Sequence, residues 1–290
     1  MSGPGVLITG SSTGLGLATA LHLAERGFHV HASVRRDDAV EQVKQAAYER
    51  GVELDVPVLD MTDPEGLRLA VDAAAERSGG LFGLVNNGGI GLRGCLEDTT
   101  AEEAERLFAT NVLGTVAVTK AVLPHLRRAG RGRVVTITSV GGRISTFGAG
   151  LYCASKFAQE GLAESLHLEL APFGLQSVII EPGIIKTERW DEHRGQAAGA
   201  ADPASPYHRL FVEAEAIADR LVERSRTTPT DVAEAVHTAL TVARPKLRYV
   251  VGRPAAAAIL ARRYLPQRTF ERVYFGTFLR VVRRRAAARP

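Results

Sequence analysis

The 290-residue sequence contains only two cysteines, Cys95 and Cys153, and a single tryptophan. Two cysteines cannot form a disulfide framework, nor can they supply the four ligands of a structural zinc site. The chain has no uninterrupted run of about 18 apolar residues, so a transmembrane helix is not expected. Its N-terminus, MSGPGVLITG, lacks a basic region followed by an apolar stretch, so no secretion signal is expected either. These absences favour a cytoplasmic location.

Acidic residues are nearly missing from one part of the chain, its C-terminal stretch. Residues 244–290 contain 13 Lys plus Arg and one acidic residue, Glu271, for a net charge of +12. The preceding 243 residues carry 23 basic and 31 acidic groups, for a net charge of −8. A nucleic-acid-binding domain concentrates positive charge on its body. Because the excess positive charge belongs to the tail, nucleic acid is not an expected partner.

What is present is an ordinary globular composition, with 45% hydrophobic and 23% charged residues. Short β-branched runs alternate with helical stretches over the first 185 residues. Strands are expected over 5–9, 28–34, 54–59, 81–86, 133–138 and 176–181, and helices over 15–26, 38–50, 64–76, 100–128 and 151–171. Such alternation predicts right-handed β-α-β crossovers. The expected fold class is α/β, a Rossmann-type doubly wound parallel sheet covered by helices on both faces.

A glycine-rich turn follows the first expected strand, with the sequence Thr9-Gly10-Ser-Ser-Thr-Gly14-Leu-Gly16 before a helix. Gly10 would let the chain turn sharply, Gly14 would let the backbone approach a phosphate, and Gly16 would let the helix pack closely on the sheet. The helix N-terminus would present free N–H groups and a positive dipole end to that anion. An ordinary tight turn is the alternative, but the strand–turn–helix order favours phosphate binding.

Several separated motifs occur in one order along the chain: TGSSTGLG at 9–16, NNGG at 86–89, Asn111, Ser139, YCASK at 152–156 and PG at 182–183. Together they resemble the short-chain dehydrogenase/reductase family over about residues 5–190. The stretch YCASKFAQEGLAESLHLELAPFG is most similar to hydroxysteroid and retinol dehydrogenases and to polyketide-type ketoreductases of secondary metabolism. Gly88 is a departure, since the family usually has Ala there. The resemblance implies a nicotinamide-dependent oxidoreductase.

Tyr152 and Lys156 are four residues apart on one expected helix and therefore lie on one face, a turn apart. A tyrosine with its ordinary pKa near ~10 is a poor acid–base catalyst at neutral pH. A nearby ammonium would lower that pKa toward the working range. The resemblance implies that Lys156 also binds the nicotinamide ribose. The spacing of Tyr152 and Lys156 alone would fit a solvent-facing tyrosine with a neighbouring lysine. The presence of Ser139 at the end of an expected strand favours a catalytic pair instead.

Two further residues complete the predicted catalytic set. Ser139 follows the apolar strand VVTIT, and ligands of open α/β sheets bind beyond the carboxyl ends of the strands. Its hydroxyl would hold the substrate oxygen, or it would be a turn or capping serine. Asn111 lies inside a long expected helix, where Asn is a mediocre helix former. The resemblance implies that it anchors a water linking Lys156 to solvent, and a surface Asn is the alternative.

These residues predict hydride transfer from a nicotinamide to a carbonyl carbon. Tyr152 would donate the proton to the forming alkoxide, Ser139 would stabilise the oxygen, and Lys156 would lower the tyrosine pKa. No metal is expected in this reaction. Alcohol oxidation would use the same residues in reverse. A nucleotide-binding scaffold or sensor that has lost catalysis is the alternative from another class of protein.

The second expected strand ends in SVRR at 33–36, with no acidic residue where NAD enzymes hold the ribose 2′-hydroxyl. Arg35 would pair with a 2′-phosphate, a bidentate contact that suits a guanidinium. Ser12 in the glycine-rich turn would add a hydrogen bond. Asp37 and Asp38 come too late in the chain unless a bulged loop brings one in. NADPH/NADP+ is therefore the expected cofactor, ahead of NAD.

Further cofactor contacts are expected beyond the turn. Asp60, after the third expected strand, would accept a hydrogen bond from the adenine amino group, with Met61 against the ring. A capping or turn aspartate is the alternative for Asp60. Thr187 would hydrogen-bond the nicotinamide carboxamide. By the resemblance, the remaining contacts are Thr13, Leu15, Asn87, Gly88, Pro182, Gly183 and Ile185.

The rest of the chain is expected to supply the substrate side. Residues 1–243 would form the dinucleotide-binding and catalytic domain, with a helical lid at about 186–228. Helices are expected over 207–224 and 230–243, and a strand over 248–251. Substrate contacts are expected from residues 90–92, 143–147, Ile184 and 190–207. Phe147, Ile184, Trp190 and Phe211 suggest an apolar pocket for a lipophilic ketone or alcohol, such as a polyketide, steroid or retinoid, or else core packing.

Residues 244–290 are expected to form a basic C-terminal extension that mixes arginines with aromatic residues and leucines. Such a segment would lie on an anionic membrane as a peripheral contact. Packing on its own domain, with the arginines solvated, is the alternative. The long helices beginning near residues 100 and 151 are candidates for a homo-oligomer contact.

Overall fold

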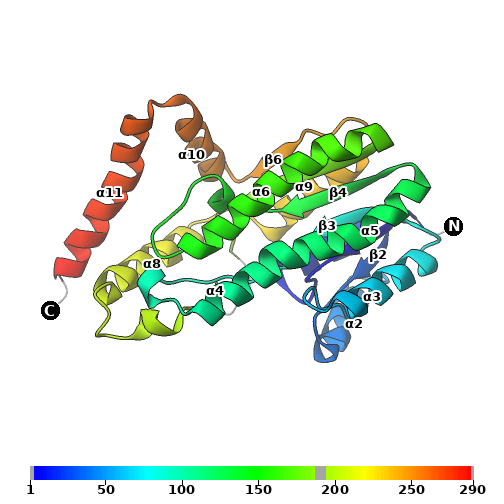
Figure 1. The fold of residues 1–290 in the computed structure, drawn as a ribbon, viewed down its shortest axis with the longest axis horizontal. Coiled ribbons are helices and arrows are strands. Elements are labelled where there is room, and N and C mark those ends of the chain that lie inside the picture. Colours follow the sequence, from blue (N-terminus) through cyan, green and yellow to red (C-terminus); the bar gives the residue numbers. More distant parts are fainter. Residues whose placement is uncertain (1–2, 187–193, 289–290) are drawn as a thin grey trace.

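The structure, a computed structural model, describes residues 3–186 and 194–288 (Figure 1). Its strands are β1 (Gly5–Ile8), β2 (His29–Ala32), β3 (Leu81–Asn86), β4 (Gly132–Ile137), β5 (Leu175–Pro182) and β6 (Arg248–Val251). Its helices are α1 (Gly14–Glu25), α2 (Val40–Glu49), α3 (Pro64–Arg77), α4 (Ala101–Phe108), α5 (Thr115–Ala129), α6 (Gly150–Leu170), α8 (His208–Glu223), α9 (Pro229–Thr241), α10 (Arg253–Tyr264) and α11 (Gln267–Ala288).

The strands form one parallel sheet in the order β2-β1-β3-β4-β5-β6, which confirms the predicted doubly wound fold. Every residue of β4 is buried, as expected for a strand covered on both faces. One apolar cluster joins the sheet to α1 and α9 and includes Ala20 and Val236. The other joins the opposite face to α3, α5 and α6 and includes Leu67, Val118 and Leu166.

The prediction of a regular strand over 54–59 is wrong. This segment runs beside β2 but forms isolated bridges, His31 to Asp55 and Val34 to Val58. The Ala32 and Val34 amides donate to the carbonyls of Asp55 (2.7 Å) and Pro57 (3.0 Å). Pro57 has no N–H to return a bond, which interrupts the ladder at that point. The segment therefore follows the sheet edge without extending the sheet.

The helix expected over 100–128 begins as predicted and then changes its geometry. Thr100 caps α4 through a reciprocal pair of hydrogen bonds with Glu103, the capping box. Residues 109–114 then form a π-helical turn before α5 begins. Such a turn holds an extra residue and often lies at functional sites. Here it contains Asn111.

The continuous helix Ala101–Ala129 is long and apolar enough to cross a membrane by length and composition. The same property belongs to core helices of globular domains. Val118, Val122 and Leu126 of this helix are fully buried against the sheet and its neighbours. Packing within the domain thus accounts for its apolar character.

The C-terminal stretch is ordered as helices packed on the domain. β6 pairs with β5, so the predicted boundary after residue 243 falls before the last strand of the sheet. α11 packs against α8 at one end of the molecule (Figure 1). Phe270 and Val282 of α11 are 2% and 0% exposed. At least one face of α11, in the basic tail, therefore packs against the rest of the chain.

Candidate active site

The sheet topology creates a crevice at one edge. The chain leaves β1 toward β2 on one side and returns to β3 on the other side of β1. At such a switch point, the loops after neighbouring parallel strands diverge and leave room for a ligand. The glycine-rich turn follows β1, and the loop 87–90 follows β3. The predicted phosphate-binding turn and the predicted cofactor contacts Asn87 and Gly88 therefore lie at the edge where this fold binds ligands.

The glycine-rich turn needs its glycines for reasons visible in the backbone. Gly10 and Gly14 have φ angles of +68° and +57°, in the left-handed region that favours glycine. A Cβ added at Gly16 would lie 2.2 Å from the Gly10 carbonyl oxygen. The first turn of α1, which begins at Gly14, contains no acidic residue. Its N-terminus thus keeps the electrostatics that suit a phosphate.

The loop after β3 is clamped onto this turn. The Asn87 side-chain amide donates to the carbonyls of Thr9 and Gly10, both at 2.9 Å. The Gly88 amide donates to Thr9 Oγ1 at 2.8 Å. A Cβ at Gly88 would lie 2.6 Å from Met61 Sδ. The departure from Ala at this position therefore has a local cause, because Met61 fills the space that a methyl group would take.

Ser139 and Tyr152 are brought together by β4 and α6. Ser139 directly follows Thr138 at the carboxyl end of β4, and its hydroxyl accepts from the Gly141 amide at 3.0 Å. A Cβ at Gly141 would lie 3.3 Å from Ser139 Oγ and 3.5 Å from Tyr152 Cε1, so the two side chains are neighbours. Burial raises the pKa of Tyr152, and the hydrogen bond with Ser139 opposes that rise. Ser139 is thus both a turn serine and a direct partner of Tyr152.

Lys156 lies one turn further along α6, and its side chain is buried, with 6% of the residue exposed. Its ammonium Nζ donates to the Ile137 carbonyl (3.1 Å) and to Gln159 Oε1 (2.8 Å). It lies 5.9 Å from the centre of the Tyr152 ring. Burial lowers the pKa of Lys156 to about 8, and the Glu160 carboxylate opposes this fall. The amine is thus held near the tyrosine, but the Tyr152 pKa is raised and not lowered, so the predicted lowering of that pKa by Lys156 stays a prediction.

Asn111 is completely buried, so the alternative of a surface residue is wrong. Its side-chain oxygen accepts from the Ile90 amide (2.8 Å), and its side-chain nitrogen donates to the Ile90 carbonyl (3.0 Å). The same nitrogen donates to Ser155 Oγ at 3.1 Å. Asn111 therefore ties the loop after β3 to the helix that carries Tyr152 and Lys156. Its predicted anchoring of a water stays a prediction.

Arg35 and Asp60, the two charged residues predicted to contact the adenosine half of the cofactor, both lie at one end of the crevice. Val34 is buried at the end of β2, and Arg35 beyond it is exposed. Arg36 forms an ion pair with Asp38 at 2.9 Å. Asp60 Oδ1 accepts from both the amide (2.8 Å) and the hydroxyl (2.7 Å) of Thr62. The alternative of a turn aspartate is therefore correct for Asp60. The predicted hydrogen bond from the adenine amino group to this carboxylate stays a prediction.

These Thr62 hydrogen bonds are the largest cause of the lowered pKa of Asp60, and the charge of Arg35 adds to it. Arg35 therefore lies close enough to Asp60 to affect its ionisation. The two residues that were predicted to contact the adenosine half of the cofactor are neighbours in space. The remaining predicted contacts in the turn, Ser12, Thr13 and Leu15, are all partly exposed there.

The segment after β5 is held by the C-terminal part of the chain. The Gly183 amide donates to the Val251 carbonyl at 2.9 Å. A Cβ at Gly183 would lie 2.8 Å from Ala255 Cβ, so this glycine lets α10 approach. Pro182 ends β5, and Ile185 is 4% exposed in the core cluster on the α1 side. The predicted contacts at Thr187 and Trp190 lie outside the described residues.

The substrate side is apolar. A pocket of about 200 Å³ lies between the loop after β3 and the start of α6. It is lined by Leu92, Gly94, Leu96, Thr99, Gly150 and Leu151. Phe211 is 2% exposed and packs with Leu107, so the alternative of core packing is correct for this residue. The Phe147 ring lies 6.5 Å from the Phe278 ring of α11, which brings the tail beside this region.

Sequence reasoning missed several partners of the site. Arg143, expected near the substrate, forms an ion pair with the fully buried Glu181 at 2.7 Å. Arg248 of β6 lies 3.1 Å from Glu160 and 3.3 Å from Glu181. The two arginine–glutamate pairings had no signal in the sequence, because the partners come from different strands and helices. Gln159 accepts a hydrogen bond from Lys156 three residues earlier on α6, and this helical spacing was visible in the sequence.

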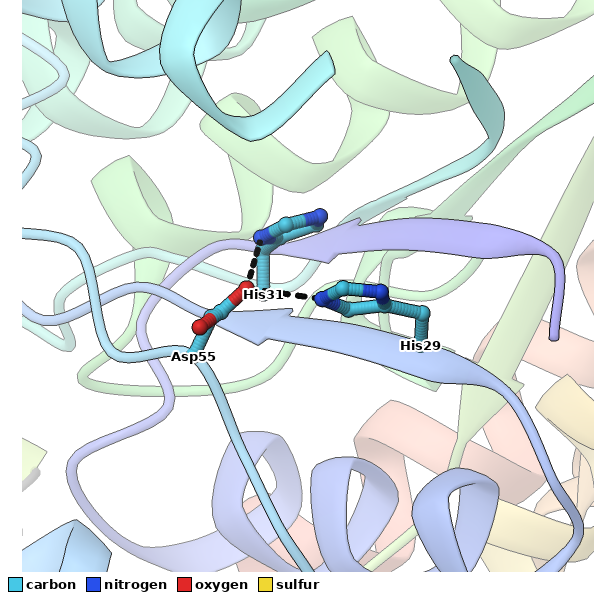
Figure 2. Close-up of side chains that lie close together, drawn as sticks. All are labelled: His29, His31 and Asp55. Atoms are coloured by element: carbon cyan, nitrogen blue, oxygen red, sulfur yellow. Dashed lines mark hydrogen bonds and ion pairs between the residues drawn. The ribbon is translucent and has the colours of Figure 1, made fainter. Parts of the chain in front are cut away.

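A histidine cluster was also missed, although the spacing His29-Val-His31 was visible in the sequence. Both rings project from the same face of β2 toward Asp55 (Figure 2). Asp55 Oδ2 lies 2.7 Å from His29 Nε2 and 3.2 Å from His31 Nδ1. By distance these three groups could hold a metal ion.

Two observations favour hydrogen bonding over metal binding at this cluster. One Asp55 oxygen already lies within reach of both rings, and Arg77 places a cation 3.9 Å from the other oxygen. His31 is 1% exposed, and burial lowers its pKa to about 4, so its ring is neutral at physiological pH, a form that suits a hydrogen bond and a metal ion equally. The cluster anchors residue 55 to the start of β2, away from the carboxyl ends where Tyr152 lies. It is not part of the active site.

Comparisons with known proteins show the family of this chain. The family model described as short chain dehydrogenase matches residues 5–198. The chain belongs to the short-chain dehydrogenase/reductase family. Retinol dehydrogenase 5 of Mus musculus is 37% identical over 280 residues, covering 92% of this chain and 86% of that protein. The uncharacterized oxidoreductase YusZ of Bacillus subtilis is 32% identical over 270 residues, covering 92% and 95%. The chain is therefore an oxidoreductase of this family.

Solved structures of the family show the same fold. A short-chain dehydrogenase from Streptomyces avermitilis is 31% identical with a TM-score of 0.79, covering 96% of this chain and 98% of that one. ElxO with NADP bound is 26% identical with a TM-score of 0.68, covering 86% and 96%. NAD+-bound xylitol dehydrogenase is also 26% identical, with a TM-score of 0.74, covering 86% and 97%. A nicotinamide cofactor is thus supported, and the crevice with its glycine-rich turn fits one.

Proposed function

We propose that this short-chain dehydrogenase/reductase catalyses the NADPH-dependent reduction of a ketone, or the reverse alcohol oxidation, on a lipophilic substrate. One observation carries the proposal. The Tyr152 and Ser139 hydroxyls meet beside the buried Lys156 at the carboxyl end of β4, next to the crevice beyond β1 and β3. A proton donor, an oxygen-binding hydroxyl and a cation thus converge where the fold binds nucleotides.

The residues of the chain would divide the chemistry among them. A bound nicotinamide supplies the hydride. Tyr152 donates the proton to the substrate oxygen while Ser139 donates a hydrogen bond that holds this oxygen in place. Lys156 stabilises the negative charge that develops on Tyr152 as its proton leaves. Asn111 fixes the loop 87–90 against α6, which keeps these groups in register with the crevice.

The preference for NADPH over NADH is supported by charge. Arg35 is exposed at the end of β2 and can turn its guanidinium toward a 2′-phosphate. The position before it, Val34, is buried and carries no carboxylate. Asp38 lies in a short helical turn after the strand and is paired with Arg36. Val34 therefore supplies no carboxylate to repel the phosphate, and the charge of Asp38 is balanced by Arg36.

The lipophilic substrate class is supported by the walls of the region beside Tyr152. The pocket next to the start of α6 is lined mainly by leucine and glycine. Phe147 and Phe278 add aromatic surface from a loop and from the tail. Ketones with large apolar skeletons, such as polyketides, steroids or retinoids, match this lining better than charged substrates do.

The test is a coupled assay of ketone reduction. NADPH oxidation is followed with a panel of steroid, retinoid and polyketide ketones and with small charged ketoacids, and each reaction is repeated with NADH. Turnover is expected with apolar ketones and NADPH. Binding of NADPH without turnover of any ketone or of the matching alcohols with NADP+ would instead support a nucleotide-binding scaffold. A KM for NADH at or below that for NADPH would contradict the cofactor preference.

We also propose that the C-terminal helices touch an anionic membrane surface peripherally. Leu260, Tyr264, Val273 and Val281 are between 40% and 71% exposed on α10 and α11, among many arginines. Exposed apolar side chains beside cationic ones favour the boundary of an anionic bilayer. Co-sedimentation with anionic liposomes is expected for the full chain. It should fall after Leu260 and Val273 are both changed to Ser, and binding that stays unchanged would contradict the proposal.

A further inference from the structure

The polar environment of Lys156 contains one residue that the catalytic set does not include, Gln159. It lies three residues further along α6, and its side chain is 1% exposed. Its Oε1 accepts from Lys156 Nζ at 2.8 Å. Its Nε2 donates to the Asn111 carbonyl at 2.6 Å and to Thr115 Oγ1 at 3.0 Å. One amide therefore connects the catalytic lysine to the π-helical turn.

The orientation of this amide is fixed by its partners. A lysine ammonium can only donate hydrogen bonds, and a backbone carbonyl can only accept them. The amide oxygen must therefore face Lys156, and the amide nitrogen must face Asn111. Thr115 Oγ1 donates to the same Asn111 carbonyl at 2.8 Å, so both lone pairs of that oxygen have protein donors. A flipped amide would oppose donor to donor and acceptor to acceptor.

We infer that Gln159 is a positioning residue that holds the Lys156 ammonium in its charged form and directs it at the active site. This inference rests on the proposed function of Lys156. An ammonium has three N–H groups, and Ile137 and Gln159 accept two of them from the β4 side and from the π-helical side. The third is then left for the crevice. A Cβ at Gly89, in the crevice loop, would lie 4.0 Å from Nζ.

The role of Gln159 is electrostatic as well as geometric. Burial favours the neutral amine of Lys156 and lowers its pKa to about 8. An amide oxygen at 2.8 Å interacts better with the ammonium than with the neutral amine, so it opposes this fall. From α6, the titratable neighbours of Lys156 are Tyr152 and Glu160. From β4 and the π-helical turn, the described neighbours are neutral carbonyl, amide and hydroxyl groups.

The Gln159→Met substitution tests this inference, because methionine is similar in length and cannot accept the ammonium hydrogen bond well. Loss of the acceptor should lower the Lys156 pKa by about 1–2 units, which is the size of one net hydrogen bond to a charged group. Ketone reduction needs a protonated Tyr152 beside a charged Lys156. The alkaline limb of kcat should therefore move to lower pH by the same amount, with kcat near pH 7 reduced about two- to ten-fold and the ketone KM changed less than about two-fold.

A second readout needs neither substrate nor cofactor. The chain contains five lysines, so NMR of protein labelled with ¹³C-lysine can follow each side chain. The Lys156 resonance is identified from its loss in Lys156→Met. Its titration midpoint is expected near 8 in the parent protein and lower in Gln159→Met. Because this titration is measured without turnover, it tests Gln159 even if the proposed reaction is wrong.

The matched control is Gln45→Met, the same substitution on the exposed surface of α2, where Gln45 binds Glu49. It should leave the titration and the pH profile unchanged. Thermal unfolding of each variant reports whether the fold is kept. The inference is overturned if the Lys156 midpoint in folded Gln159→Met equals that of the parent. It is also overturned if kcat falls equally at every pH, since that result indicates a structural role alone.

Discussion

Replacing Tyr152 with phenylalanine is expected to reduce kcat for ketone reduction by about 10²–10⁴-fold, the usual contribution of a positioned acid–base group. The change removes one hydroxyl and keeps the ring against α6. Ser139 would still hold the substrate oxygen, and Lys156 would still face the crevice. The variant would, however, lack the hydroxyl that donates the proton to the substrate oxygen. The measurement is steady-state NADPH oxidation with the best ketone of the panel.

The control for this experiment is the phenolic group of Tyr264, which is 71% exposed on α10. Tyr264→Phe removes the same atom from the same residue type, far from Ser139, and should leave kcat unchanged. NADPH affinity, measured by fluorescence titration, should be similar in Tyr152→Phe and in the parent, since the ring remains. If Tyr152→Phe keeps more than about a tenth of the parent kcat, Tyr152 is not the proton donor.

Arg35→Ser is expected to reduce kcat/KM with NADPH by about 10- to 100-fold. A charge-assisted hydrogen bond to a phosphate contributes about 1.5–3 kcal/mol, and each 1.4 kcal/mol is a factor of ten. Activity with NADH should change little, because that cofactor has no 2′-phosphate for Arg35 to bind. The ratio of kcat/KM for the two cofactors is therefore the quantity to measure.

The neighbouring arginine provides the control for this prediction. Arg36 is also exposed, but its guanidinium forms an ion pair with Asp38 at 2.9 Å. Arg36→Ser removes the same charge one residue later and should lower the NADPH preference less than Arg35→Ser does. Equal losses in the two variants would mean that the preference comes from the overall positive charge, not from a contact at Arg35.

Most of the fold followed from patterns along the chain. Apolar β-branched runs and helical stretches predicted all six strands of the parallel sheet and most helices within a few residues. The exception at 54–59 has a local cause, since Pro57 removes a ladder donor where the pattern of apolar residues still resembled a strand. The π-helical turn at 109–114 was not predicted. Its residue Asn111 bonds to Ile90, which lies outside the helix, and no local pattern of residue types reveals that contact.

The candidate site also has features that the sequence predicted and contacts that only the structure revealed. Tyr152 and Lys156 are close in sequence, and helical periodicity alone places them on one face. Ser139 was placed by the rule that side chains after a parallel strand meet at the ligand-binding edge. The structure brings its hydroxyl to Tyr152. The contacts of Phe147 with the tail and of Arg143 with Glu181 join segments far apart in the chain, so the sequence could not reveal them.

The sequence by itself determined the fold class, the glycine-rich turn and the family, and it predicted four catalytic residues, because these depend on residue types at short or regular spacing. The tertiary structure alone decided what surrounds them. It showed that Gln159 joins the Lys156 ammonium to Asn111 of the π-helical turn, that Met61 occupies the space beside Gly88, and that α11 packs on α8 near the substrate region. The physical reason is that burial and hydrogen bonding depend on neighbours in space, and packing brings those neighbours from distant parts of the chain.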